Sequence, residues 1–302
     1  DKAEMDEKTE QLYIQAGIVH VLAISGLHIS IIGMSVYTLL KRLGVGLKGS
    51  ACLSGFIVLS YGVMTGFGPS TERAVIMFLV RMGAVYLGCT YDFLSALSFS
   101  ALILFVSRPL SILQTGVWFS FAAVLSIGVL WPAIEKCIPW QCAKTRNYKI
   151  EHLKKSMGVK TTIREWIERM IRYIGPSAAV TIGTLPLTAF CYGAVPLVGF
   201  FLNLLVLPLM NLFVPMALGA GGVSLLSISM AGFCGGTLHF ILQINRFLCE
   251  KMLIMPFSVW RTGVPPSAWL LIDYGLMIGF ALLALPEHKW FKHTDIGKIL
   301  IK

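Results

Sequence analysis

The chain contains 302 residues, of which 56% are hydrophobic and only 13% are charged, with a formal net charge of +10. Because an ordinary soluble domain has about 45–50% apolar and about 25% charged residues, this composition excludes the soluble class. Apolar runs of roughly 20 residues cross a bilayer as helices, and few alternating polar and apolar runs disfavour a lipid-facing barrel. We therefore predict an all-α, multi-pass membrane protein with about 7–9 transmembrane or re-entrant helices and amphipathic interfacial helices.

The predicted helices follow one another with short breaks, except for one long polar region between the fifth and the sixth. Apolar stretches place them at residues 18–40, 50–67, 71–88, 92–107, 110–134, 177–199, 200–226, 233–254 and 267–285. Pro186 and Pro196 fall in the sixth stretch, and Pro208 and Pro215 fall in the seventh. Because proline removes a backbone donor, we expect breaks in these two helices, with simple proline kinks in packed spans as the alternative.

Composition divides the chain into five segments. An acidic leader helix at residues 1–17, expected to continue a longer upstream region, precedes a first membrane half at 18–134. Residues 135–175 form a basic loop, residues 176–286 a second membrane half and residues 287–302 a basic tail.

The basic loop predicts the orientation of the chain. It holds ten Lys or Arg and four Glu residues, and so six of the ten net positive charges. Basic loops stay in the cytoplasm, and the short loop with Lys41, Arg42 and Lys48 lies on the same side if the preceding stretches all span. Apolar residues at helical spacing from Ile163 to Ile174 predict an amphipathic helix on the membrane surface.

A second amphipathic pattern lies near residue 245. His239, Gln243, Arg246 and Glu250 are spaced so that they make one polar stripe along a helix. The stripe either lies at the membrane interface or faces water inside the protein.

The sequence predicts no cofactor and no metal. The seven cysteines are scattered and odd in number, which is not the pattern of a disulfide framework. Cys137, Cys142 and His152 have an unusual spacing for a metal site. The sequence also lacks the G-x-x-x-x-G-K-[ST] phosphate loop and the H-E-x-x-H metalloprotease motif, so any work is powered from outside the chain.

The first stretch that suggests function is HVLAISGLHIS, residues 20–30. His20, Ser25 and His28 would give one flank of a helix a polar character, and Gly26 would let another backbone approach closely. Two histidines and a Ser-Gly pair in so short a span favour a wet, functional face over simple packing.

The second stretch is TGFGPSTERAVIMFLVRMG, residues 65–83. Its glycines and proline predict a turn, and Ser70 or Thr71 would cap the helix that follows. Charges in a membrane helix are costly, so Arg73 and Arg81 should face a partner or water. An arginine at a helix N-terminus is a natural seat for phosphate, whereas the alternative is a salt bridge of Glu72 with an arginine that ties helices together.

The third stretch covers residues 181–211. Thr181, Thr184 and Thr188 share one helical face, and Asn203 and Asn211 are eight residues apart. Pro186 is expected to break the helix of the threonines, and Pro208 that of the asparagines. Polar, proline-broken helices suit a translocation path, although hydrogen bonds between packed helices explain the same residues nearly as well.

Four blocks, in this order, resemble the membrane domain of the ComEC competence family. They are HVLAISGLH (20–28), GFGPSTERA (66–74), RPLSILQTGVWFSFAAVLSIGVL (108–130) and the run with Pro186, Pro196, Asn203 and Pro208. The resemblance extends from Asp1 to about residue 256. One departure is Trp118, which stands where the family pattern has a polar Gln, while Gly116, Ser120 and Phe121 are kept.

The resemblance implies a channel in the bacterial inner membrane that imports single-stranded DNA during natural transformation. It also implies a cytoplasmic DNA helicase or motor and DNA-receptor proteins as partners, with homo-oligomerisation left open. Full-length family members carry an OB-like domain and a metallo-β-lactamase-like nuclease domain. Neither is in these 302 residues, so we expect no enzyme activity from this chain.

Sequence and resemblance together predict residues along a DNA path. Neutral or singly charged donors would hold phosphate without trapping it, and aromatic residues such as Trp118, Phe119 and Phe121 would either stack on bases or lie in the core. The predicted path residues are His20, Ser25, Gly26, His28, Ser70, Glu72, Arg73, Arg81, Ser120, Pro186, Asn203 and Pro208.

Two other functions fit parts of the sequence. An intramembrane serine protease would use Ser25, followed by Gly26, with a histidine from another helix such as His239. A small-molecule secondary transporter would also have broken helices and charged residues in the membrane, but it would show inverted repeats, and we find none.

Overall fold

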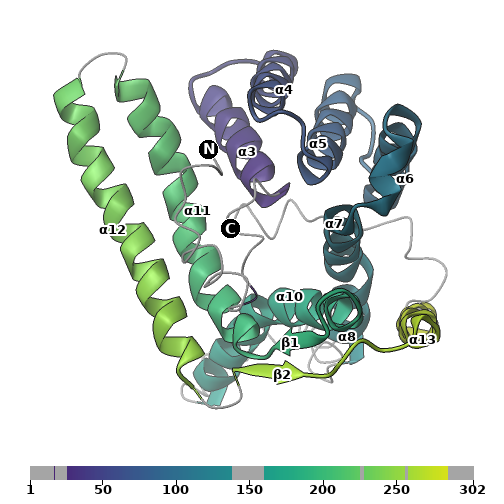
Figure 1. The fold of residues 1–302 in the computed structure, drawn as a ribbon. Coiled ribbons are helices and arrows are strands. Elements are labelled where there is room, and N and C mark those ends of the chain that lie inside the picture. The colour runs from purple at the N-terminus through teal and green to yellow at the C-terminus, as the bar shows by residue number, and fades with distance from the viewer. Residues whose placement is uncertain (1–16, 18–25, 138–159, 225–227, 256–257, 285–302) are drawn as a thin grey trace. The chain divides into compact units, whose positions relative to one another are not determined.

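The computed structural model describes residue 17 and residues 26–137, 160–224, 228–255 and 258–284. This part of the chain is mostly helical, and a pair of three-residue strands is its β-structure (Figure 1). The predicted all-α class is therefore confirmed in its main feature. His20 and Ser25, and most of the predicted leader, basic loop and tail, lie outside the described residues.

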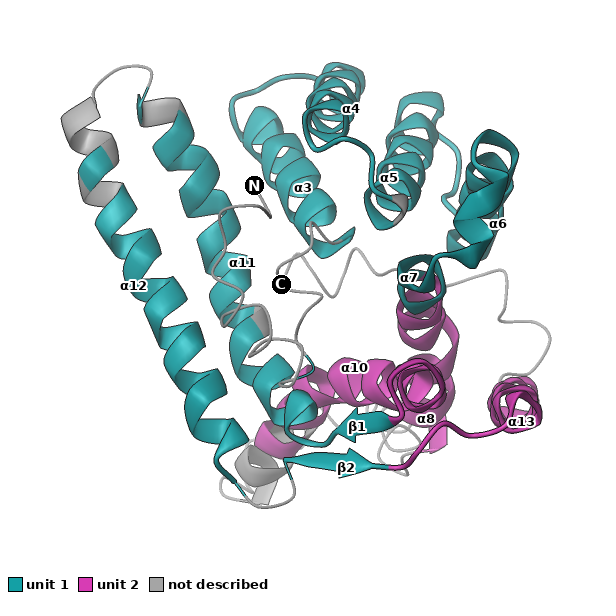
Figure 2. Cartoon of the chain, in the orientation of Figure 1, with its two compact units in different colours: residues 1–120, 194–261 teal, residues 121–193, 262–302 magenta. Residues whose placement is uncertain are grey.

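The chain forms two compact units, and each combines two separate stretches of sequence (Figure 2). Unit 1 comprises residues 1–120 and 194–261, and unit 2 comprises residues 121–193 and 262–302. The five segments predicted from composition stay a prediction.

Within the described residues, the first stretch of unit 1 contains four helices before residue 108. They are α3 (Gly26–Arg42), α4 (Leu47–Met64), α5 (Pro69–Leu87) and α6 (Phe93–Ser107). Asp92 starts α6, because its carboxylate accepts a hydrogen bond of 2.7 Å from the backbone N–H of Ser95. A 3₁₀ turn, η2 (Pro109–Leu113), then leads into α7 (Thr115–Leu125), whose first six residues belong to this unit.

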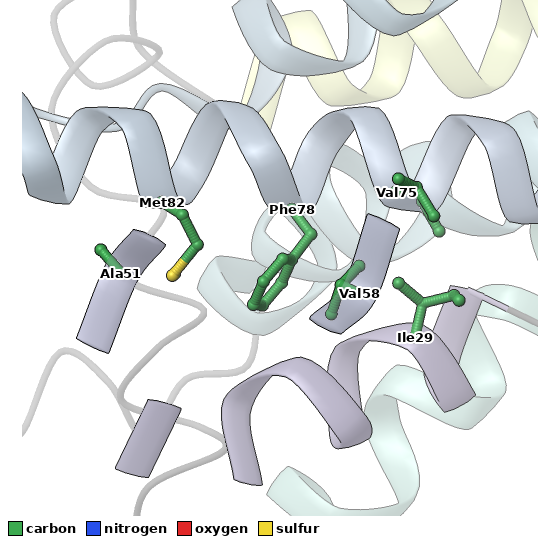
Figure 3. Close-up of a cluster of buried hydrophobic side chains, with 7 residues drawn as sticks. Ile29, Ala51, Val58, Val75, Phe78 and Met82 are labelled. Carbon is green, nitrogen blue, oxygen red and sulfur yellow. The ribbon is translucent and has the colours of Figure 1, made fainter. Parts of the chain in front are cut away.

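The core of these helices lies where α3, α4 and α5 meet (Figure 3). Small residues let the backbones approach closely: a Cβ on Gly33 would overlap the ring of Phe78. Ser54 is buried, and its hydroxyl donates to the sulfur of Met82 at 3.3 Å. The buried apolar residues of this cluster are Ile29, Ala51, Val58, Ala74, Val75, Phe78 and Met82.

The second stretch of unit 1 contains a helical hairpin. Helix α11 (Val198–Ser224) packs along α12 (Ile228–Leu253), with Leu202 and Val206 of α11 and Cys249 of α12 in their common core. Short strands flank the hairpin: β1 (Ala194–Pro196) pairs antiparallel with β2 (Val259–Arg261), with Val195 opposite Trp260. Pro196 thus lies in an edge strand, where a missing N–H is tolerated.

Unit 2 contains the remainder of α7, a π-helical turn η3 (Ser126–Leu130), α8 (Trp131–Cys137), α10 (Lys160–Tyr192) and α13 (Ser267–Ala284). Glycines of α10 receive large neighbours: a Cβ on Gly175 would overlap the ring of Trp131, and one on Gly183 would overlap Ser126. These close approaches join α10 to η3 and α8.

The predicted break at Pro186 is wrong, because α10 runs through Pro176 and Pro186 without interruption. Proline frees carbonyl groups in the preceding turn, and membrane helices satisfy them with neighbouring side chains. Pro186 frees the carbonyl of Ile182, and the next carbonyl, that of Gly183, accepts a hydrogen bond of 3.0 Å from the Tyr274 hydroxyl of α13. The predicted amphipathic helix near Ile163 is likewise the first part of α10 rather than a separate element.

The threonines on one face of α10 form hydrogen bonds within their own helix. The hydroxyls of Thr181, Thr184 and Thr188 donate to carbonyls one turn earlier, at 3.0, 2.8 and 2.8 Å. These bonds lie within the helix, so the alternative of hydrogen bonds between packed helices does not describe them.

Four helical segments of the described chain are long and apolar enough to cross a membrane. They are 47–64, 115–137, 169–192 and 267–284. A fifth arises if α11, which bends by 40° between Val206 and Pro208, counts as one span. The bend confirms a disturbance at Pro208, whereas the larger predicted number of helices stays a prediction.

Candidate functional site around Arg73

The turn before α5 orients the start of that helix. Gly66 and Phe67 have left-handed backbone conformations, with φ of 73° and 44°, and the Phe67 ring packs beside Gly62. Gly68 takes the N-cap position and makes no side-chain cap, while Pro69 occupies the first turn, where its missing N–H is harmless. The prediction of a Ser70 or Thr71 cap is therefore wrong, since both residues lie inside the helix.

Arg73 is the buried charge of this region. Only 5% of the residue is exposed. Its Nε donates to the Ser120 hydroxyl of α7 at 3.0 Å, and its Nη1 contacts the Met77 sulfur at 3.3 Å. A side chain from α5 thus reaches α7, across 47 positions of sequence.

The guanidinium of Arg73 also lies against the first residue of α3. A Cβ added to Gly26 would be 2.9 Å from Nη2 of Arg73 and 3.3 Å from the Cβ of Ala74. Glycine therefore provides the room that the guanidinium occupies. The structure brings together three predicted path residues, Gly26, Arg73 and Ser120.

Glu72 takes part in a different cluster. Its Oε1 accepts a hydrogen bond of 3.2 Å from the Ser107 hydroxyl, and its Oε2 lies 3.7 Å from Nε of Arg108. Arg108 also donates to the carbonyl of Phe67 at 2.9 Å. The alternative role of Glu72 in a salt bridge is therefore observed with Arg108 as partner, a residue that the sequence analysis did not select.

Arg81 lies further along α5 and is half-buried. The charges of Arg73 and Arg81 both influence the pKa of Tyr91, which lies in the link between α5 and α6. The pKa of Tyr91 is raised above its ordinary value, chiefly because the residue is buried. The charge of Asp92 raises this pKa further, whereas the positive charges of Arg81 and Arg73 oppose the rise. Tyr91 is a second residue that sequence reasoning missed, because nothing in its neighbours signals an electrostatic interaction with Arg73 and Arg81.

The other described path residues are more dispersed. His28 and Ser70 are half-buried on α3 and α5. Asn203 of α11 is also half-buried, and its Oδ1 has no hydrogen-bond partner within the described part of the chain. Pro208 lies at the bend of α11 in unit 1, whereas Pro186 lies in unit 2.

Trp118 does not lie in the core, because 47% of it is exposed. Its indole N–H donates to the carbonyl of Ile112 at 2.7 Å, which fixes η2 against the start of α7. Phe119 and Phe121 are half-buried. An exposed indole leaves the stacking hypothesis open for Trp118.

The polar stripe of α12 is exposed. His239 and Gln243 contact each other at 3.0 Å between ring and amide nitrogens, and Arg246 pairs with Glu250 at 2.9 Å. Within the described residues, no group of three His, Cys, Asp or Glu side chains is arranged to hold a metal ion. Cys142 and His152 lie outside that part of the chain.

Comparisons with known proteins give consistent matches. The chain is 24% identical to ComE operon protein 3 of Bacillus subtilis over 293 residues, which is 95% of this chain and 33% of that protein. Competence protein ComA of Neisseria gonorrhoeae is 24% identical over 275 residues, covering 85% of this chain and 32% of its own length. Recombination protein 2 of Haemophilus influenzae is 24% identical over 304 residues, covering 94% of this chain and 32% of its own length.

The chain therefore spans about one third of the length of these curated relatives. No solved structure matches it. The family model described as competence protein matches residues 1–287, nearly the whole chain. The resemblance to the ComEC family is thereby confirmed, and the chain belongs to the competence-protein family.

Proposed function

We propose that this chain forms part of a channel that imports single-stranded DNA across the bacterial inner membrane during natural transformation. Family membership over residues 1–287 supports a role in competence. The observation that carries the finer proposal is the contact of Gly26, Arg73 and Ser120, three residues from separate helices.

The physical requirement is severe. A DNA strand carries one negative charge per nucleotide, and a charge in the bilayer interior is costly unless the protein supplies water, donors and positive potential. A guanidinium meets this need well, because its planar fork matches the geometry of a phosphate and stays charged.

The surroundings of Arg73 hold that fork in one orientation. Ser120 and Met77 engage Nε and Nη1, and Nη2 points at the side of Gly26. Because Arg73 is only 5% exposed, a passing strand could reach it only after a helix that covers it moves away, such as α3 at Gly26 or α7 at Ser120. We therefore assign the observed contact to the closed state of the path.

The remaining features of the proposal concern the whole protein. The chain would be a multi-pass protein of the inner membrane that hands the strand to a cytoplasmic helicase or motor and receives it from DNA-receptor proteins. It would act by binding and guiding DNA rather than by a covalent step. Neither a homo-oligomer nor a single subunit is preferred.

The test is the transformation frequency of a host whose full-length gene carries Arg73→Lys, with the protein level in the membrane measured in parallel. Lysine keeps the charge and nearly the length but loses the planar fork. We expect a fall of at least about tenfold, equivalent to about 1.4 kcal/mol, at an unchanged protein level.

The matched control is Arg108→Lys, the same substitution in an arginine whose side chain is 51% exposed. It should leave transformation within about twofold of wild type. Normal transformation in the Arg73→Lys strain, with normal protein level, would show that Arg73 only packs helices.

A further inference from the structure

The loop between α3 and α4 combines basic and apolar side chains on one surface. We define the α3–α4 loop surface by Lys41, Arg42, Leu43, Leu47 and Lys48. Leu43 and Leu47 are 70% and 56% exposed, and the three basic residues are exposed as well. Two large apolar side chains in such a short loop are costly in water.

The loop has a defined conformation. The backbone N–H groups of Leu43 and Val45 bond to the carbonyls of Leu39 and Leu40, each at 3.0 Å. The Ser50 hydroxyl donates to the carbonyl of Val45 at 3.1 Å. Gly44 provides the left-handed turn with φ of 82°. The leucines are therefore held at the surface by the fold.

Two of the lysines make cation–π contacts with tyrosine rings. The ammonium of Lys41 lies 5.8 Å from the ring centre of Tyr37, and that of Lys48 lies 5.4 Å from the ring centre of Tyr86. Such contacts attract a cation to the ring face and restrict where its charge is presented.

The surface lies at one end of a candidate membrane span, since α4 begins at Leu47. A residue at the end of a span is at the boundary between headgroups and acyl chains. From Leu39 to Lys48 the sequence has three basic residues and no acidic residue. The charge therefore complements an anionic layer.

We propose that the α3–α4 loop surface binds anionic phospholipid headgroups of the surrounding leaflet. The three basic side chains contact the headgroup phosphates, and Leu43 and Leu47 enter the acyl region beneath them. A nucleic acid would satisfy the charges but would leave both leucines in water, whereas a lipid satisfies both. The proposal is independent of the DNA path.

The experiment measures lipid retention by native mass spectrometry. The complete chain is released from detergent micelles that contain phosphatidylglycerol and phosphatidylcholine. Two proteins are compared, the wild type and the triple variant Lys41→Gln/Arg42→Gln/Lys48→Gln. Each basic residue near an anionic surface contributes about fivefold in binding, so the triple variant should lose most of its phosphatidylglycerol while it keeps its phosphatidylcholine. Because the three side chains are exposed, the thermal unfolding midpoint should not change.

A matched pair of single variants tests the location. Lys48→Gln should lower phosphatidylglycerol retention, whereas Lys251→Gln, an exposed lysine 5.5 Å from the Phe247 ring centre, should not. Equal losses in both variants would overturn the proposal, as would unchanged retention in the triple variant. If the triple variant loses binding of a single-stranded oligonucleotide but keeps its lipid, the surface contacts DNA and the lipid assignment is wrong.

Discussion

Arg73 and Arg108 are two arginines of unit 1 in opposite surroundings. Arg73 is 5% exposed and reaches a hydroxyl of α7, whereas the side chain of Arg108 is 51% exposed and lies beside the carboxylate of Glu72. An ion pair whose cation is half in solvent contributes less to stability than a fully buried cation, which depends on every contact around it. Arg108 therefore makes a contact at the end of a helix, whereas Arg73 is a charge buried among packed helices.

The largest effect should come from Arg73→Ala. Removing the side chain leaves the Ser120 hydroxyl without this donor and opens space between α3, α5 and α7. We expect the free energy of unfolding to fall by about 2–4 kcal/mol. Thermal or denaturant unfolding in micelles measures it, and a value within about 0.5 kcal/mol of wild type would remove the contrast with Arg108.

The next effect should come from Gly26→Ala. Its Cβ would be 2.9 Å from Nη2 of Arg73, so the guanidinium must shift. Because Ser120 and Met77 hold the guanidinium in place, the shift should cost about 1–3 kcal/mol. Gly83→Ala, also in a helix (α5), is the control, because a Cβ at Gly83 would have no neighbour within 4 Å. This variant should be as stable as wild type or more stable by up to about 1 kcal/mol, since alanine favours a helix over glycine. Equal unfolding curves for the two variants would contradict the close approach at Gly26.

A smaller effect is expected from Ser120→Ala, which removes only the hydroxyl that Arg73 Nε contacts. The loss should be about 1–2 kcal/mol. In the Arg73→Ala background the same substitution should cost less, because its partner is already gone. Additive losses would show that the two side chains do not interact.

The smallest effect should come from Arg108→Ala. Its contact with Glu72 is long, at 3.7 Å, and its own side chain is 51% exposed, but the Glu72 carboxylate beside it is only 13% exposed. We therefore expect about 1 kcal/mol, less than for the fully buried Arg73. A loss as large as that of Arg73→Ala would mean that burial does not distinguish the two arginines.

Much of the fold could be predicted from the sequence because the apolar runs are long. The expected helices at 71–88, 92–107 and 267–285 correspond to α5, α6 and α13 within a few residues. Proline was a poorer guide: the bend near Pro208 is present, but α10 passes Pro186, whose turn is supported by Tyr274 from another helix. A local pattern does not contain that distant donor.

The candidate site was only partly predictable for the same reason. Arg73, Gly26 and Ser120 could each be selected as unusual in an apolar segment, but their contact joins positions far apart in sequence. Arg108 and Tyr91 were missed, since an arginine or tyrosine at a helix end has many ordinary roles. Likewise, the interleaved units follow from packing between helices rather than from composition.

The most direct test of the central claim is a photocrosslinking measurement on incoming DNA. A transforming strand that carries 4-thiothymidine would be irradiated during uptake, and the crosslinked peptides of this chain identified by mass spectrometry. We predict crosslinks to the peptides that contain Arg73 and Ser120, and their loss in the Arg73→Lys strain. Efficient uptake with crosslinks only elsewhere in the chain would contradict a DNA path at Arg73.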